Sequence, residues 1–391
     1  MKNKYHSNNV FFIQLSQLVK GVLVMVVLLL FIFSLSGLLT SIKVDLRPSS
    51  HSVNEAASAF TGRMLFSVLS LENQYFGASL TEDEREFSLP KQLLKYSTQI
   101  SLDDPRSFLG RELPGFSIFD TEILVAGLDT NYTNMPYESS PPDDNLPKGD
   151  SSLQHVEDLD QKSDEPVTPG DTNGKNVVFI YHSHNTESYL PYLKDVKDPD
   201  SAYHNEINIT QVGNRLQNAL MAKGIGTVLN QEDIQQNLKE KGLKYSKSYQ
   251  ESRVVVQEAM SGNKDYQYFI DVHRDNRRKD QTTITINGQT YAKIACVVGG
   301  KNAKFEKNLA LAERIHNELE KKYPGISRGV FKQGGAGQNG VYNQDLSEKA
   351  LLIEAGGVDN TFEELNRSMD AFADAFSTYY WSEKEAEEVN N

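Results

Sequence analysis

The sequence contains little cysteine and no excess of positive charge. Its 391 residues include one cysteine, Cys296, so an intramolecular disulfide cannot form. Cys296 lies in the apolar run IACVV with no cationic residue beside it, which indicates a buried structural side chain rather than a nucleophile. Acidic residues outnumber basic ones, 53 to 40, and the formal net charge is −13. Nucleic-acid binding requires a basic face, so we expect no nucleic-acid partner.

Three motifs of familiar enzyme classes are absent or out of context. The metalloprotease motif H-E-x-x-H does not occur, which excludes a helical zinc site of that type. Residues 325–329 match G-x-S-x-G, but a nucleophile elbow follows a strand, whereas this stretch follows a helical segment ending in KKYP. We therefore do not expect Ser327 to be a nucleophile. Residues 334–337 are rich in glycine without a following G-K-S/T, which indicates a flexible loop rather than a phosphate site.

One long apolar run lies near the N-terminus. Residues 21–42 contain no charged side chain, and about 22 residues at about 1.5 Å each span about 33 Å, enough for a bilayer core. Lys2, Lys4 and Lys20 precede the run, so residues 1–20 are expected in the cytoplasm and the rest of the chain outside it. The run is too long for a usual signal peptide and no A-x-A site follows, which favours an uncleaved transmembrane anchor.

Four segments follow the anchor. Residues 43–126 have apolar side chains at helical spacing and predict a small, mostly helical extracytoplasmic region. Residues 127–173 are rich in Pro, Asp, Ser and Gly, which is typical of an acidic, disordered linker. Residues 174–382 are expected to form the catalytic domain and to fold without the linker. Residues 383–391 are expected to be a C-terminal tail.

Strand-like and helix-like segments alternate through residues 174–382. The expected strands are 176–182, 224–230, 266–273, 282–288, 291–299 and 350–356, and the expected helices are 208–224, 245–262, 302–324 and 361–381. This alternation predicts an α/β fold with a mostly parallel twisted sheet flanked by helices. Asn287-Gly288 is a strong hairpin signal, so some antiparallel pairing is expected at an edge.

Three of the predicted strands end in ionisable side chains. The first ends in His182 and His184, the third in His273, and the last in Glu354. One such residue alone is typical of a structural group. Ligands of open α/β sheets bind beyond the carboxyl ends of the strands, so three such ends together predict one functional site.

These residue types predict a zinc site. A catalytic zinc keeps three protein ligands and one open position, and His184 and His273 are the expected imidazole ligands. The third ligand is either Glu187, at H-x-x-E spacing from His184, or Glu206, at the start of a helix where a carboxylate is favourable. Glu354 is expected to be the general base.

Two further histidines are left without a firm assignment. His204 lies close to Glu206 in sequence and is a candidate for a group that hydrogen-bonds a metal ligand and orients it. His182 lies two residues from His184, and its role stays open.

The order of these motifs over residues 175–380 resembles the zinc-dependent N-acetylmuramoyl-L-alanine amidases, which cut peptidoglycan. In that family a zinc histidine ends the first strand, a glutamate ligand starts a helix, a second histidine ends a later strand, and a late glutamate is catalytic. His184, Glu206, His273 and Glu354 occupy those places in order. The resemblance implies an amidase-like fold with a Zn²⁺ cofactor, and it favours Glu206 over Glu187 as the third ligand.

The chain departs from the usual amidase pattern because IYHSHNTESYLP replaces the Gly-His-Gly-Gly loop. That loop, HNEINIT, DVHRD, the apolar N-terminus and the acidic linker together resemble the stage II sporulation protein P family. The resemblance implies a single-pass membrane protein whose catalytic domain faces the septal intermembrane space. It also implies amidase activity, endopeptidase activity on peptide cross-links, and stage II sporulation proteins D and M as partners during engulfment.

Two other functions compete with the amidase interpretation. A zinc carboxypeptidase-like peptidase would use His184, Glu187 and His273 and would trim peptide ends. A wall-binding scaffold without activity is the second alternative, although the intact set of four site residues argues against a decayed site.

Overall fold

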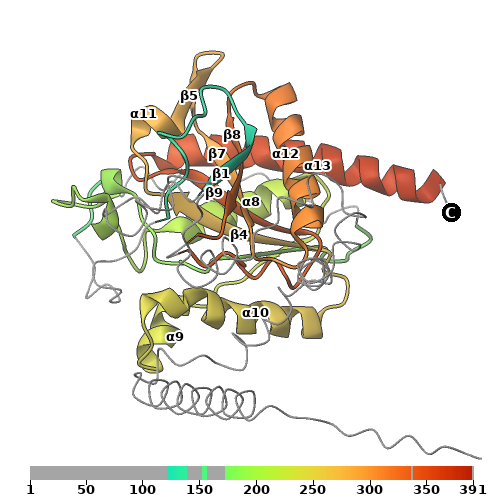
Figure 1. Cartoon of the computed structure of the whole chain (residues 1–391), viewed down its shortest axis with the longest axis horizontal. Helices are drawn as coiled ribbons and strands as arrows, with labels where there is room; N and C mark the ends of the chain where they lie inside the picture. The colour runs from blue at the N-terminus through green and yellow to red at the C-terminus, as the bar shows by residue number, and fades with distance from the viewer. Residues whose placement is uncertain (1–120, 139–151, 156–171, 336–337, 390–391) are drawn as a thin grey trace, which may run out of the picture. The chain divides into compact units, whose positions relative to one another are not determined.

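The computed structural model describes residues 121–138, 152–155, 172–335 and 338–389 (Figure 1). The expected cytoplasmic N-terminus and transmembrane anchor lie outside these ranges, as do the helical region up to residue 120 and most of the linker. Within the described ranges, no helix is both long and apolar enough to cross a membrane.

A seven-stranded sheet forms the centre of the described domain, in the order β1-β8-β7-β9-β4-β2-β3. Four of its six pairings are parallel, and β7 and β8 run opposite to their neighbours β9 and β1. The α/β class is as expected, but the sheet is mixed in its interior. The strands are β1 (Glu122–Ala126), β2 (Val178–Tyr181), β3 (Thr227–Leu229), β4 (Tyr268–Asp275), β7 (Ile294–Gly299), β8 (Ser327–Gln333) and β9 (Ala350–Gly357).

The predicted hairpin is present and forms a small sheet of its own. β5 (Thr283–Ile286) and β6 (Gln289–Ala292) pair antiparallel, with Ile286 opposite Gln289. Asn287 and Gly288 have φ angles of 51° and 80°, as a two-residue hairpin turn requires. The antiparallel pairing expected at an edge is made by β1 with β8, whereas the hairpin stands apart from the seven-stranded sheet.

Helices cover both faces of the seven-stranded sheet. One face packs against α8 (Ile209–Ala222), α12 (Phe305–Lys322) and α13 (Phe362–Val389), and the other against α10 (Ser248–Gly262), which neighbours α9 (Ile234–Glu240) (Figure 1). The shorter elements are α11 (Lys279–Thr282) and the 3-10 turns η5 (Leu190–Tyr192), η6 (Pro199–Ser201) and η7 (Tyr245–Lys247). The expected tail at 383–391 continues α13 as far as Val389, because its Lys, Glu and Ala residues favour helix.

Strand alternation assigns side chains to the two faces. On β2, Val178 and Ile180 belong to the core beneath α8 and α13, whereas Phe179 packs on the α10 side. On β4, Ile270 and Val272 belong to the first core. Because successive side chains of a strand point to opposite faces, the residues between and after them project toward α10.

Side-chain caps mark the starts of two helices. Asn208 Oδ1 accepts a hydrogen bond from the Thr210 N–H at 3.0 Å and begins α8. Before α13, Glu364 Oε2 accepts from the Thr361 N–H at 3.1 Å, while Thr361 Oγ1 accepts from the Glu364 N–H at 3.3 Å. This reciprocal pair is a capping box, which fixes where α13 leaves the end of β9.

The first residues of the expected linker belong to the sheet domain. β1 pairs antiparallel with β8, and residues 127–138 continue from it. Met135 is fully buried, and its carbonyl accepts a 2.8 Å hydrogen bond from Arg277 Nε. The acidic composition of residues 127–173 predicted a linker throughout. Its first residues, 127–138, nevertheless bury apolar side chains and form backbone hydrogen bonds with the domain. We refer to residues 127–138 as the strap.

Candidate metal centre

The candidate site lies where β4 extends beyond its shorter neighbour β2. Tyr181, the last residue of β2, is opposite Asp271. The remaining residues of β4, 272–275, therefore continue past the end of β2. His273 on β4 is opposite Glu354 on β9, and both therefore project from the same face of the sheet. The predicted convergence of strand ends is thus realised by the sheet register.

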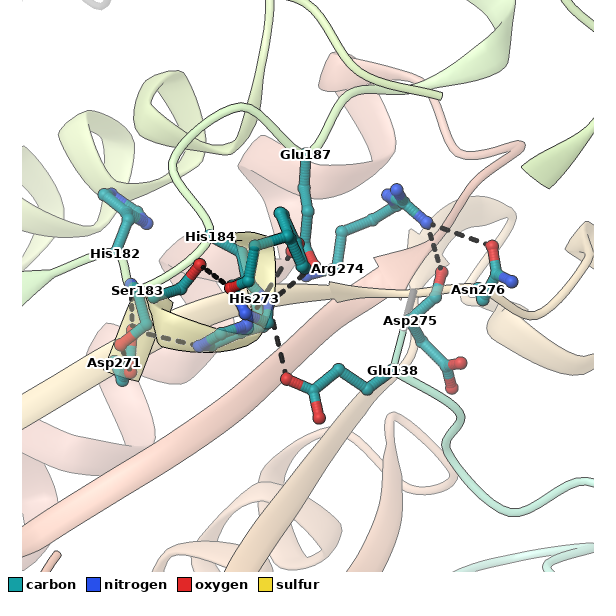
Figure 2. A network of polar contacts seen from close by, with 12 residues as sticks. Glu138, His182, Ser183, His184, Glu187, Asp271, His273, Arg274, Asp275 and Asn276 are labelled. Atoms are coloured by element: carbon teal, nitrogen blue, oxygen red, sulfur yellow. Dashed lines mark hydrogen bonds and ion pairs between the residues drawn. The ribbon is translucent and has the colours of Figure 1, made fainter. Parts of the chain in front are cut away.

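His184 and Glu187 come from the loop that follows β2. The Glu187 N–H donates to the His184 carbonyl at 3.1 Å, which turns the chain so that the two side chains meet. His184 Nδ1 lies 3.3 Å from Glu187 Oε1, and both side chains are buried. The same carboxylate reaches His273, with Oε2 at 3.8 Å from Nδ1. Glu187 thus contacts both imidazoles through its two carboxylate oxygens (Figure 2).

Glu138, at the end of the strap, is a further carboxylate at this site. Its Oε1 lies 3.4 Å from His184 Nδ1 and accepts a 2.8 Å hydrogen bond from the Tyr249 hydroxyl. Ligand atoms of Glu138, His184 and His273 all lie within 4.8 Å of one another. Figure 2 shows the Glu138 side chain reaching toward the two histidines. A segment remote in sequence therefore supplies a fourth polar group.

The strap is tied to the end of β4, which holds Glu138 in place. The Tyr137 N–H donates to Asp275 Oδ1 at 2.9 Å, and the Tyr137 carbonyl accepts from the Asn276 N–H at 3.0 Å. Arg328 forms a buried ion pair with Asp275 and also donates to the Asn134 carbonyl. These bonds connect β4, β8 and the strap at the mouth of the site.

Glu206, the favoured third ligand, lies elsewhere. Its side chain is exposed, and among the described residues no hydrogen bond or ion pair joins its carboxylate to either histidine. The nearby His204 accepts the backbone N–H groups of Glu206 and Ile207 at 3.0 Å, so it shapes the turn before α8. The structure brings Glu187 to the two histidines instead.

His182 faces away from the other histidines. Its Nδ1 lies 2.8 Å from the Val272 carbonyl, and its ring fills the space above Gly213 of α8, where a β-carbon would come within 2.3 Å of Nε2. Burial lowers the pKa of His182 to about 4, so the ring is neutral near pH 7. These contacts give His182 a packing role on the α8 side of the sheet.

The charges around Glu187 favour the ionised form of its carboxylate. Burial alone would raise the pKa of Glu187, but the nearby His184, His273 and Arg274 lower it to about 2. Burial alone would lower the pKa of His273, yet Asp271 and Glu187 raise it to about 10. The site therefore attracts positive charge at its centre.

Glu354 has a different environment from Glu187. Its side chain is buried, and its Oε2 has no hydrogen-bond partner in the described part of the chain. Burial raises the pKa of Glu354 well above its ordinary value; His273 opposes this rise, and the carboxylates of Asp275, Glu187 and Glu138 add to it. A carboxyl group of this kind takes up a proton readily, as a general base must.

Unsatisfied buried atoms indicate that the site fits a metal ion. His184 Nδ1, His273 Nδ1 and Glu187 Oε1 are buried, lie close to one another and have no hydrogen bond to any described residue. Leaving such atoms unpaired is costly, and a cation that accepts their lone pairs removes that cost. Two imidazoles with one or two carboxylates form a donor set suited to zinc.

Aromatic rings line the site on the α10 side. Tyr245 stacks on His184 with ring centroids 4.6 Å apart and an interplanar angle of 30°. Tyr249 stacks on His273 at 5.9 Å and 19°. The two tyrosines come from η7 and α10, and they keep the imidazoles from rotating and limit access of water from that side.

Other groups noted in the sequence have structural contacts. Ser327 is buried at the start of β8, where its Oγ lies 2.7 Å from His316 Nδ1, and it does not open a helix. Cys296 is buried on β7, and burial raises its pKa to about 12, as expected of an unreactive thiol. Arg274, the arginine of the DVHRD motif, is fully buried and donates to the Ala202 carbonyl at 3.2 Å.

No sequence pattern identified Glu138 or Asp271 as a site residue. Glu138 lies in MPYESSPPDD, where the surrounding Pro and Asp residues indicate a linker. The apolar stretch EILVA before it was the available signal for a strand. Asp271 lies inside an otherwise apolar strand, two residues before His273, and that spacing places both on one face.

Comparison with known proteins identifies relatives over most of the chain. Residues 103–377 match the family "Stage II sporulation protein P (SpoIIP)". Stage II sporulation protein P of Bacillus subtilis (strain 168) is 51% identical over 376 residues, covering 95% of this chain and 93% of the relative.

Two solved structures are more distant. The crystal structure of N-acetylmuramoyl-L-alanine amidase from Clostridium difficile 630 is 18% identical, covers 54% of this chain and 97% of its own, and has a TM-score of 0.33. The crystal structure of the N-acetylmuramyl-L-alanine amidase Ami1 from Mycobacterium smegmatis is 14% identical, covers 53% and 97%, and has a TM-score of 0.31.

Proposed function

The chain belongs to the stage II sporulation protein P family, and from this premise and the site geometry we propose that it is a zinc-dependent peptidoglycan hydrolase. The bond cleaved in this proposal is the amide between N-acetylmuramic acid and the L-alanine of the stem peptide. The observation that carries the proposal is a cluster of buried atoms, His184 Nδ1, His273 Nδ1 and Glu187 Oε1, that make no hydrogen bond to any described residue.

Three residues hold the metal in this proposal. His184 and His273 would hold it through Nδ1, the ring atoms nearest the Glu187 carboxylate, and Glu187 would supply the third ligand. We assign Glu187 rather than Glu206 as the third ligand, because the Glu187 carboxylate contacts both His184 and His273. Bound zinc supplies an activated water and polarises the scissile carbonyl.

Glu354 moves the protons of the reaction. Its carboxylate accepts a proton from the attacking water and returns it to the leaving amide nitrogen, as a single positioned acid–base group can do. Its burial and raised pKa suit a group that is protonated for part of the cycle. The Arg274 N–H, which donates to Glu187 Oε2 at 2.9 Å, keeps the ligand carboxylate from turning away.

The proposal also includes a location and partners. Residues 21–42 would anchor the chain in the cell membrane, with the hydrolase domain in the septal intermembrane space. Stage II sporulation proteins D and M are the proposed protein partners, and peptidoglycan is the substrate. Fractionating sporulating cells and testing whether the chain stays with the membrane after salt washing checks the anchor.

The zinc-carboxypeptidase alternative keeps its own support, because the structure gathers its three proposed ligands, His184, Glu187 and His273. The two enzymes differ in product rather than in metal chemistry. A non-enzymatic scaffold differs from both, since it needs no metal.

Zinc removal and return tests the proposal against the scaffold. Purified full-length chain should contain one zinc, lose lysis of purified cell walls after treatment with a chelator, and regain it when zinc is added. His273→Ala should bind little zinc and should not be restored. A folded chain without zinc and without zinc-stimulated lysis would leave only the scaffold function.

A further inference from the structure

Asp271 is a fully buried carboxylate close to the proposed metal site. It lies two residues before His273 on β4, so both side chains project toward the α10 side of the sheet. A buried carboxylate is costly unless its oxygens are hydrogen-bonded, so its partners indicate what it does. Those partners are Ser183, which precedes His184 in the chain, and His273 (Figure 2).

On one side, Asp271 holds the loop that carries His184. Its Oδ1 accepts the Ser183 N–H at 2.9 Å, and its Oδ2 accepts the Ser183 hydroxyl at 2.6 Å. Ser183 immediately precedes His184, so these two bonds fix the start of the loop. Asn343 Nδ2 donates to Ser252 Oγ at 2.9 Å, and Ser252 Oγ lies 2.7 Å from Ser183 Oγ, which supports the arrangement from behind.

On the other side, Asp271 approaches His273. Its Oδ1 lies 3.0 Å from His273 Nε2, within ion-pair distance but not in line for a full hydrogen bond. A histidine that binds metal through Nδ1 carries its proton on Nε2, and a carboxylate beside Nε2 selects that form and orients the ring. The Nδ1 atom then faces Glu187 and His184.

We propose that Asp271 is the positioning residue that aligns His184 and His273 for metal binding, holding one through Ser183 and the other through Nε2. This inference rests on the proposed zinc site. One carboxylate thus sets the relative placement of two ligands that come from different strands. It is not itself a ligand, because its oxygens are directed to Ser183 and to the far side of the His273 ring.

The test compares full-length wild type with Asp271→Asn, which keeps the shape of the side chain and removes its charge. The zinc dissociation constant is measured by competition with a chromophoric chelator. Loss of a group that orients a metal ligand typically weakens zinc affinity by about 10- to 100-fold, and we expect a loss in that range. The Nε2 proton of His273 should give a slowly exchanging NMR signal in wild type and lose that signal in Asp271→Asn.

Asp345→Asn is the matched control. The Asp345 carboxylate accepts a 2.7 Å hydrogen bond from each of the two terminal guanidinium nitrogens of Arg253. It shares none of the Asp271 contacts. It should leave zinc affinity and the His273 signal unchanged. Wild-type zinc affinity together with an unchanged His273 signal in Asp271→Asn would overturn the inference.

A second variant covers the case in which Asp271→Asn does not fold. Ser183→Ala keeps the Asp271 charge but removes the hydroxyl that holds it, so zinc affinity should fall by less while the His273 proton signal is kept. Unchanged zinc affinity in Ser183→Ala would then contradict the proposal. Failure of wild type to bind zinc would instead refute the proposed function, and the NMR comparison would still decide the role of Asp271.

Discussion

Glu187 is the residue whose position most changes the interpretation of the site. Its carboxylate spans the two imidazoles and is held by the Arg274 N–H. Glu206 has the spacing of a helix-initiating ligand but is exposed on the approach to α8. Sequence spacing made both candidates reasonable, and only the turn after His184, which no local pattern specifies, distinguishes them.

Glu187→Gln and Glu206→Gln therefore form a matched pair of variants. We expect Glu187→Gln to weaken zinc binding by more than the about 10- to 100-fold typical of groups outside the ligand set, because an amide is a poor zinc ligand. Glu206→Gln should bind zinc as wild type does. Chelator competition measures both, and the reverse ranking would assign the ligand role to Glu206.

Glu354→Gln separates a base from a ligand. The substitution keeps size and hydrogen bonding but removes the proton acceptor, so turnover should fall by about 10²- to 10⁴-fold. Zinc content should stay at the wild-type level, since Glu354 is not placed among the ligands. Zinc content and rate are measured on the same preparation: lost zinc would make Glu354 a ligand, and a near-normal rate would make it structural.

At the scale of elements, β1 and the strap extend the domain beyond the boundary expected at residue 174. β1 completes one edge of the sheet, and the strap brings Glu138 to His184. This pairing joins residues about 200 positions apart in sequence. Short strands of this kind depend on a distant partner. The sequence therefore placed β1 in the helical region 43–126 and the strap in the linker, whereas the structure joins both to the sheet domain.

Removing β1 and the strap should cost stability. Unfolding in urea of residues 98–391 is compared with that of residues 174–391. The shorter fragment should be less stable by at least about 2 kcal/mol, because burying one large apolar side chain such as Met135 is worth about 1.5–3 kcal/mol. Met135→Ala in the longer fragment is the control and should account for part of the loss.

Equal unfolding free energies for the two fragments would support the boundary at residue 174. In that case the strap would be a peripheral segment, and Glu138 would have no fixed place at the site. A lower stability without loss of zinc binding would show that the strap supports the fold while the two histidines and Glu187 suffice for the metal.

At the scale of the whole molecule, the alternation of strand and helix patterns correctly predicted an α/β domain. It did not predict antiparallel pairing in the interior of the sheet, where β7 lies between β8 and β9 and pairs antiparallel with β9. Strand order depends on contacts between distant segments, which periodicity does not encode. His273 and Glu354 could be paired in advance because both end apolar runs, whereas Glu138 could not.

We propose that this chain uses bound zinc to cut the bond between glycan and stem peptide. Mass spectrometry of purified cell walls digested by the full-length chain tests it most directly. We expect glycan strands that have lost whole stem peptides beginning with L-alanine, and no such products from zinc-depleted chain or from Glu354→Gln. Glycan strands that keep their stem peptides, shortened only at the far end, would contradict amidase activity and support the carboxypeptidase alternative.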